Sequence, residues 1–349
     1  MEDIYISKKR RSSDEIDFVF LDNQLPSPPE PEFEPPKRKK KKHGFLKFIA
    51  SVLIIAFLFS SAFIFVFAAA SGYTRNDLET NKYISSAQLK SSPLVSNILL
   101  LGVDGSADSS SRSDSMILVS VDFAHMKIKL TSFLRDSWVE IPSKGKKGKL
   151  NSACSHGGPQ LVVDTIEYNF GVDIDHYVMV DFDMFTQIID CLGGIDIEVT
   201  EKEAKYINKT TRHTVDSGEN VHLNGDEALV YCRIRKLDSD YMRTYRQRKV
   251  ITALIGQAKN AGVAALIETM RNIFPLIQTD MSAAEITGLA YKAGIGVLAC
   301  EIEQNRVPID EHMKPDTRNG QWVEVLDLEA TKEYLQDYIY TNKIKIEEE

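Results

Sequence analysis

The chain has 349 residues, of which 43% are hydrophobic and 26% charged, and its formal net charge is −8. This is the composition of an ordinary globular protein. Residues 1–47 carry 11 basic and 9 acidic residues, whereas the rest of the chain carries 31 basic and 41 acidic residues. That acidic balance excludes a general nucleic-acid-binding surface, so any bound anion has to be held by a local cluster of positive charge.

The N-terminal part divides into a basic, proline-rich tail over residues 1–44 and an apolar segment over residues 45–72. Six of the 12 prolines lie between Pro26 and Pro36, and the stretch from Phe48 to Tyr73 contains no charged residue. Proline disfavours helix and sheet, so we expect a disordered tail. The apolar stretch exceeds the roughly 20 helical residues that span a bilayer. The basic run 37–42 just before it predicts a cytoplasmic N-terminus, a single transmembrane helix and an extracellular domain.

Other interpretations of this region are less favoured. Ala68-Ala69-Ala70 resembles a signal-peptidase site, but the apolar stretch is longer than the h-region of a typical signal peptide. The basic run resembles a nucleic-acid signal, but beside a membrane span it is explained more simply as a topology signal that also favours anionic lipid.

From residue 97 onward, strands and helices are expected to alternate. Buried strands are predicted at 97–103, 116–121 and 127–133, with a turn at 123–126. Helices follow at 159–170, 184–192, 224–231 and 241–261, and strands at 176–180 and 195–199. Residues 263–293 are expected to be mostly helical, with a last strand near 299–306 and a helix near 328–339. The alternation predicts an α/β fold whose central sheet is covered on both faces.

The chain lacks the common short catalytic motifs, such as GxSxG, HExxH and the Walker loop. The histidines are scattered, and His156, His176 and His222 are interpreted as structural or surface residues. The four cysteines have no metal-binding spacing and are interpreted as small buried residues, with their disulfide state left open: Cys154, Cys191, Cys232 and Cys300.

Carboxylates and arginines gather instead at strand ends and helix starts. Asp104 follows one apolar strand and Asp114 precedes the next, so the two carboxylates are placed to share a hard divalent cation such as Mg²⁺. Arg135-Asp136 ends the third strand, and residues 231–248 carry six Lys or Arg. Arg243 and Arg246 share one face of the predicted helix. Arginine pairs bidentately with phosphate oxygens, so the cluster predicts a pyrophosphate site with Mg²⁺ and metal-assisted phosphoryl transfer or phosphate binding.

Several separated segments resemble the LytR-CpsA-Psr family of bacterial envelope proteins, in order and in spacing, over residues 95–262. They are LLGVDGS (100–106), RSDSMILVSVD (112–122), SFLRDSWVEIP (132–142), KLNSACSHGGPQL (149–161), DHYVMVDFDMFTQIIDCLGGIDIEV (175–199), HLNGDEALVYCRIRK (222–236) and RTYRQR (243–248). The resemblance implies one extracellular α/β/α domain with a central mixed sheet flanked by helices. It divides the outer part into a stalk or cap (73–95), the catalytic domain (96–262) and a mainly helical C-terminal part packed on it or extending it (263–349).

The resemblance also implies roles for individual residues. The implied metal ligands are Asp104 and Asp114, and the implied catalytic residues are Asp114, Arg135 and Asp136. Asp136 orients Arg135, with a base role toward the incoming hydroxyl as the alternative. The residues expected to grip the pyrophosphate are Arg112, Arg135, Arg233, Arg235, Arg243, Arg246 and Gln247, with Lys149 and Asn151 in support. The chain departs from the family pattern at Cys232, at Arg248 and in SFLRD, and none of these departures removes a charged group from the site.

The implied activity is a phosphotransferase with Mg²⁺, or Mn²⁺ in its place. It moves an anionic glycopolymer (a teichoic acid, capsule or secondary wall polysaccharide) from a polyprenyl-pyrophosphate carrier to peptidoglycan. The alternatives are a polyprenyl-pyrophosphate hydrolase and a non-catalytic, lipid-binding regulator. The family has a hydrophobic tunnel for the lipid tail, so the apolar residues of 159–170 and 184–192 either line it or form ordinary core.

Overall fold

The structure is a computed structural model that describes residues 61, 72–104, 112–261, 268–269, 271–289, 300–341 and 343. The expected cytoplasmic tail and nearly all of the expected transmembrane segment lie outside these residues. Within the described ranges, no helix has the length and apolar character needed to cross a membrane.

The centre of the fold is a seven-stranded sheet with the order β1-β10-β7-β2-β3-β4-β11. Its strands are β1 (Thr74–Arg75), β2 (Val95–Val103), β3 (Ser113–Asp122), β4 (Lys127–Phe133), β7 (His176–Val180), β10 (Gln278–Thr279) and β11 (Glu301–Val307). β2, β3 and β4 pair antiparallel, whereas β7 joins β2 and β11 joins β4 in parallel. The sheet is therefore mixed, which confirms the expected α/β fold with a mixed central sheet and flanking helices.

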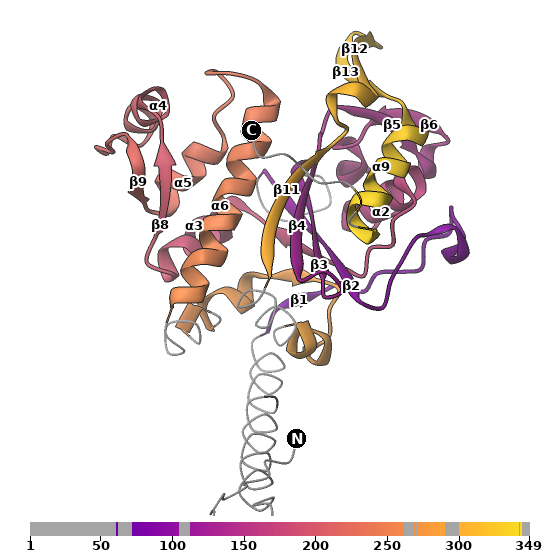
Figure 1. Ribbon diagram of the computed structural model, residues 1–349, viewed down its shortest axis with the longest axis horizontal. Helices are drawn as coiled ribbons and strands as arrows, with labels where there is room; N and C mark the ends of the chain where they lie inside the picture. The colour runs from indigo at the N-terminus through magenta and orange to yellow at the C-terminus, as the bar shows by residue number, and fades with distance from the viewer. Residues whose placement is uncertain are drawn as a thin grey trace, which may run out of the picture. The chain divides into compact units, whose positions relative to one another are not determined.

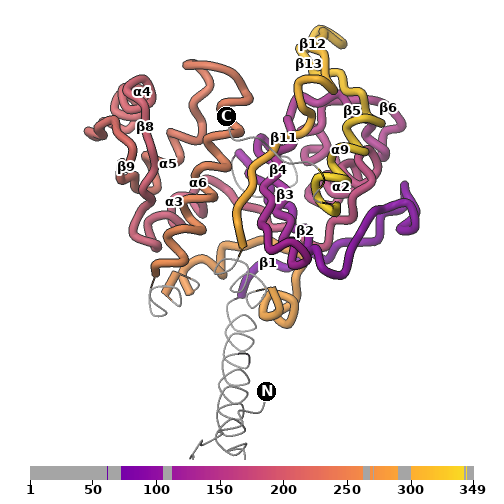
Figure 2. The backbone as a smooth tube through the Cα atoms, viewed as in Figure 1, coloured from indigo at the N-terminus to yellow at the C-terminus, as the bar shows by residue number. Residues whose placement is uncertain are grey.

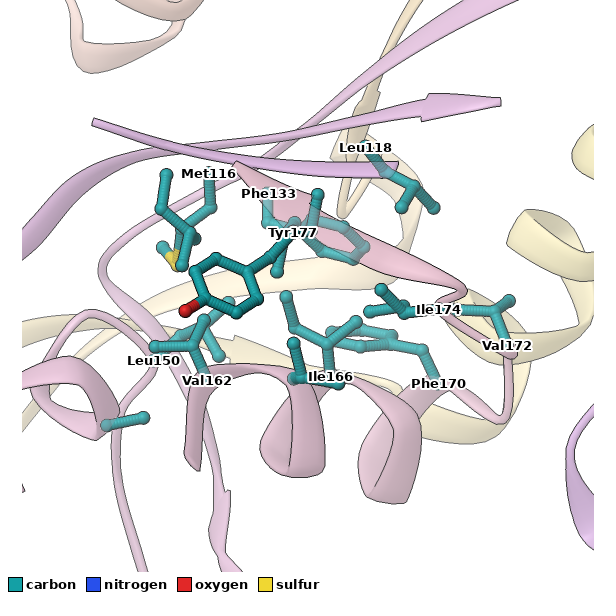
Figure 3. Close-up of a cluster of buried hydrophobic side chains, with 14 of the residues drawn as sticks. Met116, Leu118, Phe133, Leu150, Val162, Ile166, Phe170, Val172, Ile174 and Tyr177 are labelled. Atoms are coloured by element: carbon teal, nitrogen blue, oxygen red, sulfur yellow. The ribbon is translucent and has the colours of Figure 1, made fainter. Parts of the chain in front are cut away.

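Apolar residues lie on both faces of this sheet, so helices cover both faces. On one face, Leu99 and Met116 pack with residues of α2 (Ser152–Phe170) and α9 (Leu328–Tyr340), and Figure 3 shows part of this core around Phe133 and Tyr177. On the other face, Ile117 packs with Ile251 of α6 (Asp240–Asn260). Figure 1 shows α2 and α9 on one side of the central strands and α6 on the other.

A second layer lies beyond α6, which contacts both β8 and the central strands β4 and β11. It consists of the antiparallel pair β8 (Ile195–Val199) and β9 (Gly218–Leu223) with the helices α3 (Phe182–Cys191), α4 (Glu201–Thr211) and α5 (Gly225–Cys232). These elements enclose their own apolar core, which includes Ile197, Ile207 and Tyr231.

A smaller four-stranded sheet has the order β12-β13-β5-β6. It joins β5 (Ser137–Ile141) and β6 (Lys146–Lys149) to the C-terminal hairpin of β12 (Met313–Arg318) and β13 (Gln321–Leu326). Figure 2 shows this hairpin, drawn in yellow, beside the magenta segments of β5 and β6. Short 3₁₀ helices lie at Ser86–Gln88, Pro142–Lys144, Phe274–Leu276 and Asp310–His312.

The structure contains elements that the sequence did not predict, both within 96–262 (β5, β6, α4 and β9) and in the C-terminal part. β11 is the strand expected near 299–306, but it is not the last one, because β12 and β13 follow it. The described residues after 262 include strands as well as helices. The central sheet takes strands from all three of the ranges 73–95, 96–262 and 263–349, because β1 and β10 extend one edge and β11 the other.

Most apolar residues of 159–170 lie in the buried core of the fold. Val162, Ile166 and Phe170 are fully buried in the cluster drawn in Figure 3. In α3, Ile189 is buried in the second core, and Phe185 packs against that core while half-buried. Cys154, Cys191, Cys232 and Cys300 form no disulfide.

Candidate active site

The topology brings the predicted site residues to one edge of the central sheet. Val103 at the end of β2 pairs with Ser113 at the start of β3, and the end of β4 lies beside the same part of β3. Asp104 directly follows β2, Asp114 is the second residue of β3, and Arg135 lies two residues after the end of β4. Three separated sequence motifs therefore meet because the strands are antiparallel neighbours.

Asp114 is the centre of an ion-pair cluster. Its Oδ2 accepts a hydrogen bond from Arg235 Nη2 at 2.7 Å, and its Oδ1 lies 3.2 Å from Arg135 Nη1. Asn151 Nδ2 lies 3.5 Å from the same Oδ1, and Arg243 Nη2 donates to the backbone oxygen of Asp114 at 3.1 Å. One carboxylate thus contacts two arginines of the cluster at once.

The electrostatics of the cluster follow from these contacts. Burial alone raises the pKa of Asp114, but Arg135, Arg235 and Arg243 together lower it below its ordinary value. Burial lowers the pKa of Arg243 to about 10, and this side chain is only 2% exposed. Arg243 is thus a buried cation beside Arg135 and Arg235, and a bound anion would stabilise its charged form.

Asp136 and Asp240 complete the cluster. Arg135 Nε lies 3.4 Å from Asp136 Oδ2, and Arg135 Nη2 lies 3.4 Å from Asp240 Oδ1. Asp136 Oδ1 accepts from Lys149 Nζ at 2.6 Å, and Asp240 Oδ2 accepts from Arg243 Nη2 at 3.0 Å. Arg135 is therefore fixed from three sides by carboxylates, so its guanidinium is positioned before any ligand arrives.

A pocket of about 850 Å³ opens over this cluster. It contains most of the residues that the sequence predicted. The predicted residues that line it are Asp104, Arg112, Asp114, Arg135, Asp136, Lys149, Asn151 and Arg235. Its charged lining consists of five Lys or Arg side chains and three carboxylates, so the pocket is locally positive within an acidic domain. We call it the anion pocket.

Four of the predicted anion ligands lie outside the lining of the anion pocket. Arg233 stacks on the ring of Phe182, with its guanidinium carbon 4.3 Å from the ring centroid. Gln247 Oε1 accepts from Ser115 Oγ at 3.1 Å. Arg243 is the third, and its Nη2 donates to the backbone oxygen of Asp114.

Arg246, the fourth residue outside the lining, is buried. Its Nε donates to Glu203 Oε1 at 2.6 Å, and its other nitrogens pair with Asp238 and with the backbone oxygen of Ile234 at 3.4 Å. These contacts hold both ends of the short segment that carries Arg235. The structure thus gives Arg246 a positioning contact, whereas its predicted direct contact with pyrophosphate stays a prediction.

Sequence reasoning missed the contribution of the β12–β13 hairpin. Asn319 and Gln321 line the anion pocket, and Trp322 and Glu324 lie in the same hairpin. Asn319-Gly320 forms its two-residue turn with φ of 53° and 73°, which are the positive values of a type I′ turn. An Asn-Gly pair between two short extended segments is the signal that finds this hairpin.

The donor chemistry at Asp104 and Asp114 fits a hard divalent cation. Both are oxygen ligands at neighbouring strand ends and both line the anion pocket. Over the residues that the structure describes, no group of three or more His, Cys, Asp or Glu side chains is arranged to hold a metal ion. Mg²⁺ is nevertheless commonly held by one or two carboxylates with phosphate oxygens completing its shell.

Comparison with known proteins places this arrangement in a family. The model of the LytR_cpsA_psr family matches residues 62–337. The chain therefore belongs to the LytR-CpsA-Psr family, as the separated motifs indicated.

Relatives of this chain include proteins named as teichoic acid transferases. The chain is 38% identical to the polyisoprenyl-teichoic acid–peptidoglycan teichoic acid transferase TagU of Halalkalibacterium halodurans, over 46% of this chain and 53% of that protein. It is 35% identical to the TagU of Bacillus mycoides, over 69% of this chain and 77% of that protein. The chain thus spans about half the length of the first of these relatives.

The fold matches a solved structure of the family. A structure of TagT with bound octaprenyl pyrophosphate lipid superimposes with a TM-score of 0.58 at 23% identity, covering 76% of this chain and 99% of the other. At this identity the match supports the fold.

Proposed function

We propose that this chain is a phosphotransferase that moves an anionic glycopolymer from a polyprenyl-pyrophosphate carrier to peptidoglycan. The observation that carries the proposal is the pairing of Arg135 and Arg235 with Asp114 in the lining of the anion pocket. Two arginines fixed in this way present bidentate donors to a diphosphate group. The names of the relatives supply the same donor and acceptor classes.

The reaction in this proposal is a displacement at phosphorus. A sugar hydroxyl of peptidoglycan attacks the phosphorus that is bonded to the glycopolymer, and the new O–P bond forms as the bond to the bridging oxygen breaks. The hydroxyl proton passes to a base, for which Asp136 is the candidate, and polyprenyl phosphate leaves. Arg135, Arg235 and Arg112 stabilise the charge that builds on the leaving phosphate, because such catalysis depends mainly on positioning and electrostatics.

Asp104 and Asp114 are the residues that would hold Mg²⁺, or Mn²⁺ in its place. The bound ion would supply charge neutralisation at the diphosphate oxygens. Asp114 would then contact both the metal and the arginines, and its lowered pKa keeps it ionised at neutral pH.

The lipid tail needs an apolar path beside the anion pocket. We propose the face of the central sheet under α6, where Val119, Ile251 and Ile302 are half-buried apolar residues that pack on a buried cluster. The transmembrane helix proposed for residues 45–72 would hold the extracellular domain beside a carrier whose tail stays in the bilayer.

A reconstituted reaction tests the proposal. The full chain is mixed in vesicles with lipid-linked teichoic acid precursor, uncross-linked peptidoglycan and Mg²⁺, and free and wall-linked polymer are separated. Polymer attached to peptidoglycan is the expected product. Release of free polymer alone would establish the hydrolase instead. A lipid-linked precursor that stays intact would support a non-catalytic lipid-binding protein.

A further inference from the structure

A second pocket of about 420 Å³ adjoins the anion pocket. The two pockets share Arg135, Asp136 and Arg235 as a common wall. The remaining lining comes from the first turn of α6, from Leu134 and from the hairpin strand β13. A phosphoryl group held by the shared arginines is therefore reachable from either pocket.

The charge of the second pocket is opposite to that of its neighbour. Its charged lining consists of two arginines and three carboxylates, the latter being Asp136, Asp240 and Glu324. The anion pocket has five basic side chains against three carboxylates. An anionic polymer is thus favoured in the anion pocket and disfavoured in the second pocket, which leaves the second pocket to a group without negative charge.

Trp322 gives the second pocket an exposed aromatic wall. It is 51% exposed, one of the largest exposed fractions among the large hydrophobic residues of the described chain. Trp322 and Glu324 are two residues apart on β13, so their side chains lie on the same face of the strand. An exposed indole that lines a pocket is a surface on which the C–H face of a sugar ring packs well.

Glu324 lines the same pocket and carries a carboxylate oxygen without a partner among the described residues. The residue is 2% exposed, and its Oε1 accepts from Tyr241 Oη at 2.6 Å. Its Oε2 is buried and has no hydrogen-bond partner among the described residues. Buried carboxylate oxygens are normally satisfied, so this oxygen is matched to a donor that arrives with a ligand.

The backbone joins Glu324 to the proposed reaction centre. Glu324 N donates to Asp136 O at 3.0 Å, and Glu324 pairs with Ser137 across the β13–β5 ladder. A ligand hydroxyl bound to Glu324 therefore lies beside the chain segment that carries Arg135 and Asp136.

From these observations we infer that the second pocket is the acceptor subsite and binds a neutral pyranose ring of the peptidoglycan glycan strand. Trp322 packs on the ring, Glu324 Oε2 accepts from one ring hydroxyl, and a neighbouring hydroxyl faces the phosphorus held by Arg135 and Arg235. The inference rests on the proposed transferase function and adds where the acceptor binds and which residues select it.

Steady-state kinetics on the full chain in vesicles test the inference. Trp322→Ala is expected to raise KM for uncross-linked peptidoglycan roughly tenfold and to leave KM for the lipid-linked donor unchanged, since one aromatic contact is lost. Glu324→Gln keeps the shape of the side chain and is expected to raise the same KM. Tyr168→Ala, which removes an aromatic residue of 38% exposure from α2, is the matched control and should change neither constant.

Two outcomes would overturn the inference. One is an unchanged acceptor KM in both pocket variants that still melt like the parent chain. The other is a rise in donor KM, which would assign the pocket to a sugar of the donor.

A binding measurement separates failure of the inference from failure of the proposed function. The chain contains two tryptophans, so Trp138→Phe leaves Trp322 as the only indole. Titration with the β-1,4-linked tetramer of N-acetylglucosamine should shift its fluorescence, and Glu324→Gln should weaken that binding. A chain that binds the tetramer in this way but transfers no polymer would contradict the proposed function alone. A chain that transfers polymer without this binding response would contradict the inference alone.

Discussion

Arg235 Nη2 and Asp114 Oδ2 lie 2.7 Å apart, although 121 positions separate the two residues in the sequence. Arg235 comes from the segment after α5, and Asp114 from the start of a central strand. The contact joins the second layer of the fold to the central sheet at the anion pocket. The proposed activity therefore depends on both layers keeping their relative position.

The proposed metal site predicts different responses from its two carboxylates. Asp104→Asn should lower the transfer rate about tenfold and recover in part at high Mg²⁺, because one ligand of the ion is weakened. Asp114→Asn should lower the rate roughly 100-fold without recovery, since it also releases two arginines that stabilise developing charge. EDTA should stop transfer by the parent chain.

Initial rates at several Mg²⁺ concentrations check this prediction. Asp196→Asn, a half-exposed carboxylate paired with His222 away from the pocket, is the control. A reaction that is insensitive to EDTA would exclude the proposed role of the metal.

Arg246 is predicted to act through stability and position. Arg246→Met leaves Glu203, which is nearly buried, and Asp238 without their partner. The free energy of unfolding should fall by about 3 kcal/mol, the size seen when one member of a buried ion pair is removed. Adding Glu203→Gln should restore part of that loss. Denaturant titration measures both variants, and a fully stable Arg246→Met chain with weak donor binding would instead identify a direct ligand.

Lys129 is predicted to fix the C-terminal helix without taking part in transfer. Its fully buried Nζ donates to the backbone oxygens of Tyr338 and Ile339 at 2.8 and 2.9 Å and to Asp122 at 2.9 Å. Lys129→Met should destabilise the fold by about 3 kcal/mol because these acceptors stay buried. The transfer rate per folded molecule should stay the same. A chain of unchanged denaturation midpoint would contradict this assignment.

The free energy of unfolding is predicted to depend on pH through Glu167. Burial raises its pKa from 4.5 to about 7, against hydrogen bonds from Asn81 and Ile174 that lower it. The folded state binds this proton more tightly than the unfolded chain, so stability from this group is fully present below pH 4.5 and is lost as pH rises to about 7. The difference amounts to about 3 kcal/mol.

Unfolding measured between these pH values checks the sign. Glu167→Gln should flatten the curve, whereas Glu201→Gln, at a fully exposed carboxylate, should leave its slope unchanged. Equal slopes for Glu167→Gln and the parent chain would refute the prediction.

The sequence predicted the parts of the site that depend on local strand order. Asp104, Asp114 and Arg135 were expected together because consecutive apolar strands with short turns become neighbours, and their strand ends do meet. The three-residue spacing of Arg243 and Arg246 on one helix was also informative. It did not show that Arg246 points to Glu203, because the helix that carries Glu203 was not predicted.

The parts that depend on distant pairing were not accessible in the same way. β13 pairs with β5 across almost 190 residues of chain, and neither strand has the continuous apolar pattern that marked the central strands. Trp322 and Glu324 consequently had no predicted relation to Arg135. The Asn319-Gly320 turn can be recognised from the local sequence. Its relation to the site depends on the pairing of β13 with Ser137 of β5.

The central claim is that an acceptor hydroxyl attacks the phosphorus bonded to the glycopolymer while arginines hold the diphosphate. A donor carrying ³²P at that phosphorus tests this most directly, when incubated with the chain, Mg²⁺ and uncross-linked peptidoglycan. The account predicts that the label enters peptidoglycan in a phosphodiester, and that unlabelled polyprenyl phosphate is released. Label that remains with the lipid, or leaves with free polymer, would contradict it.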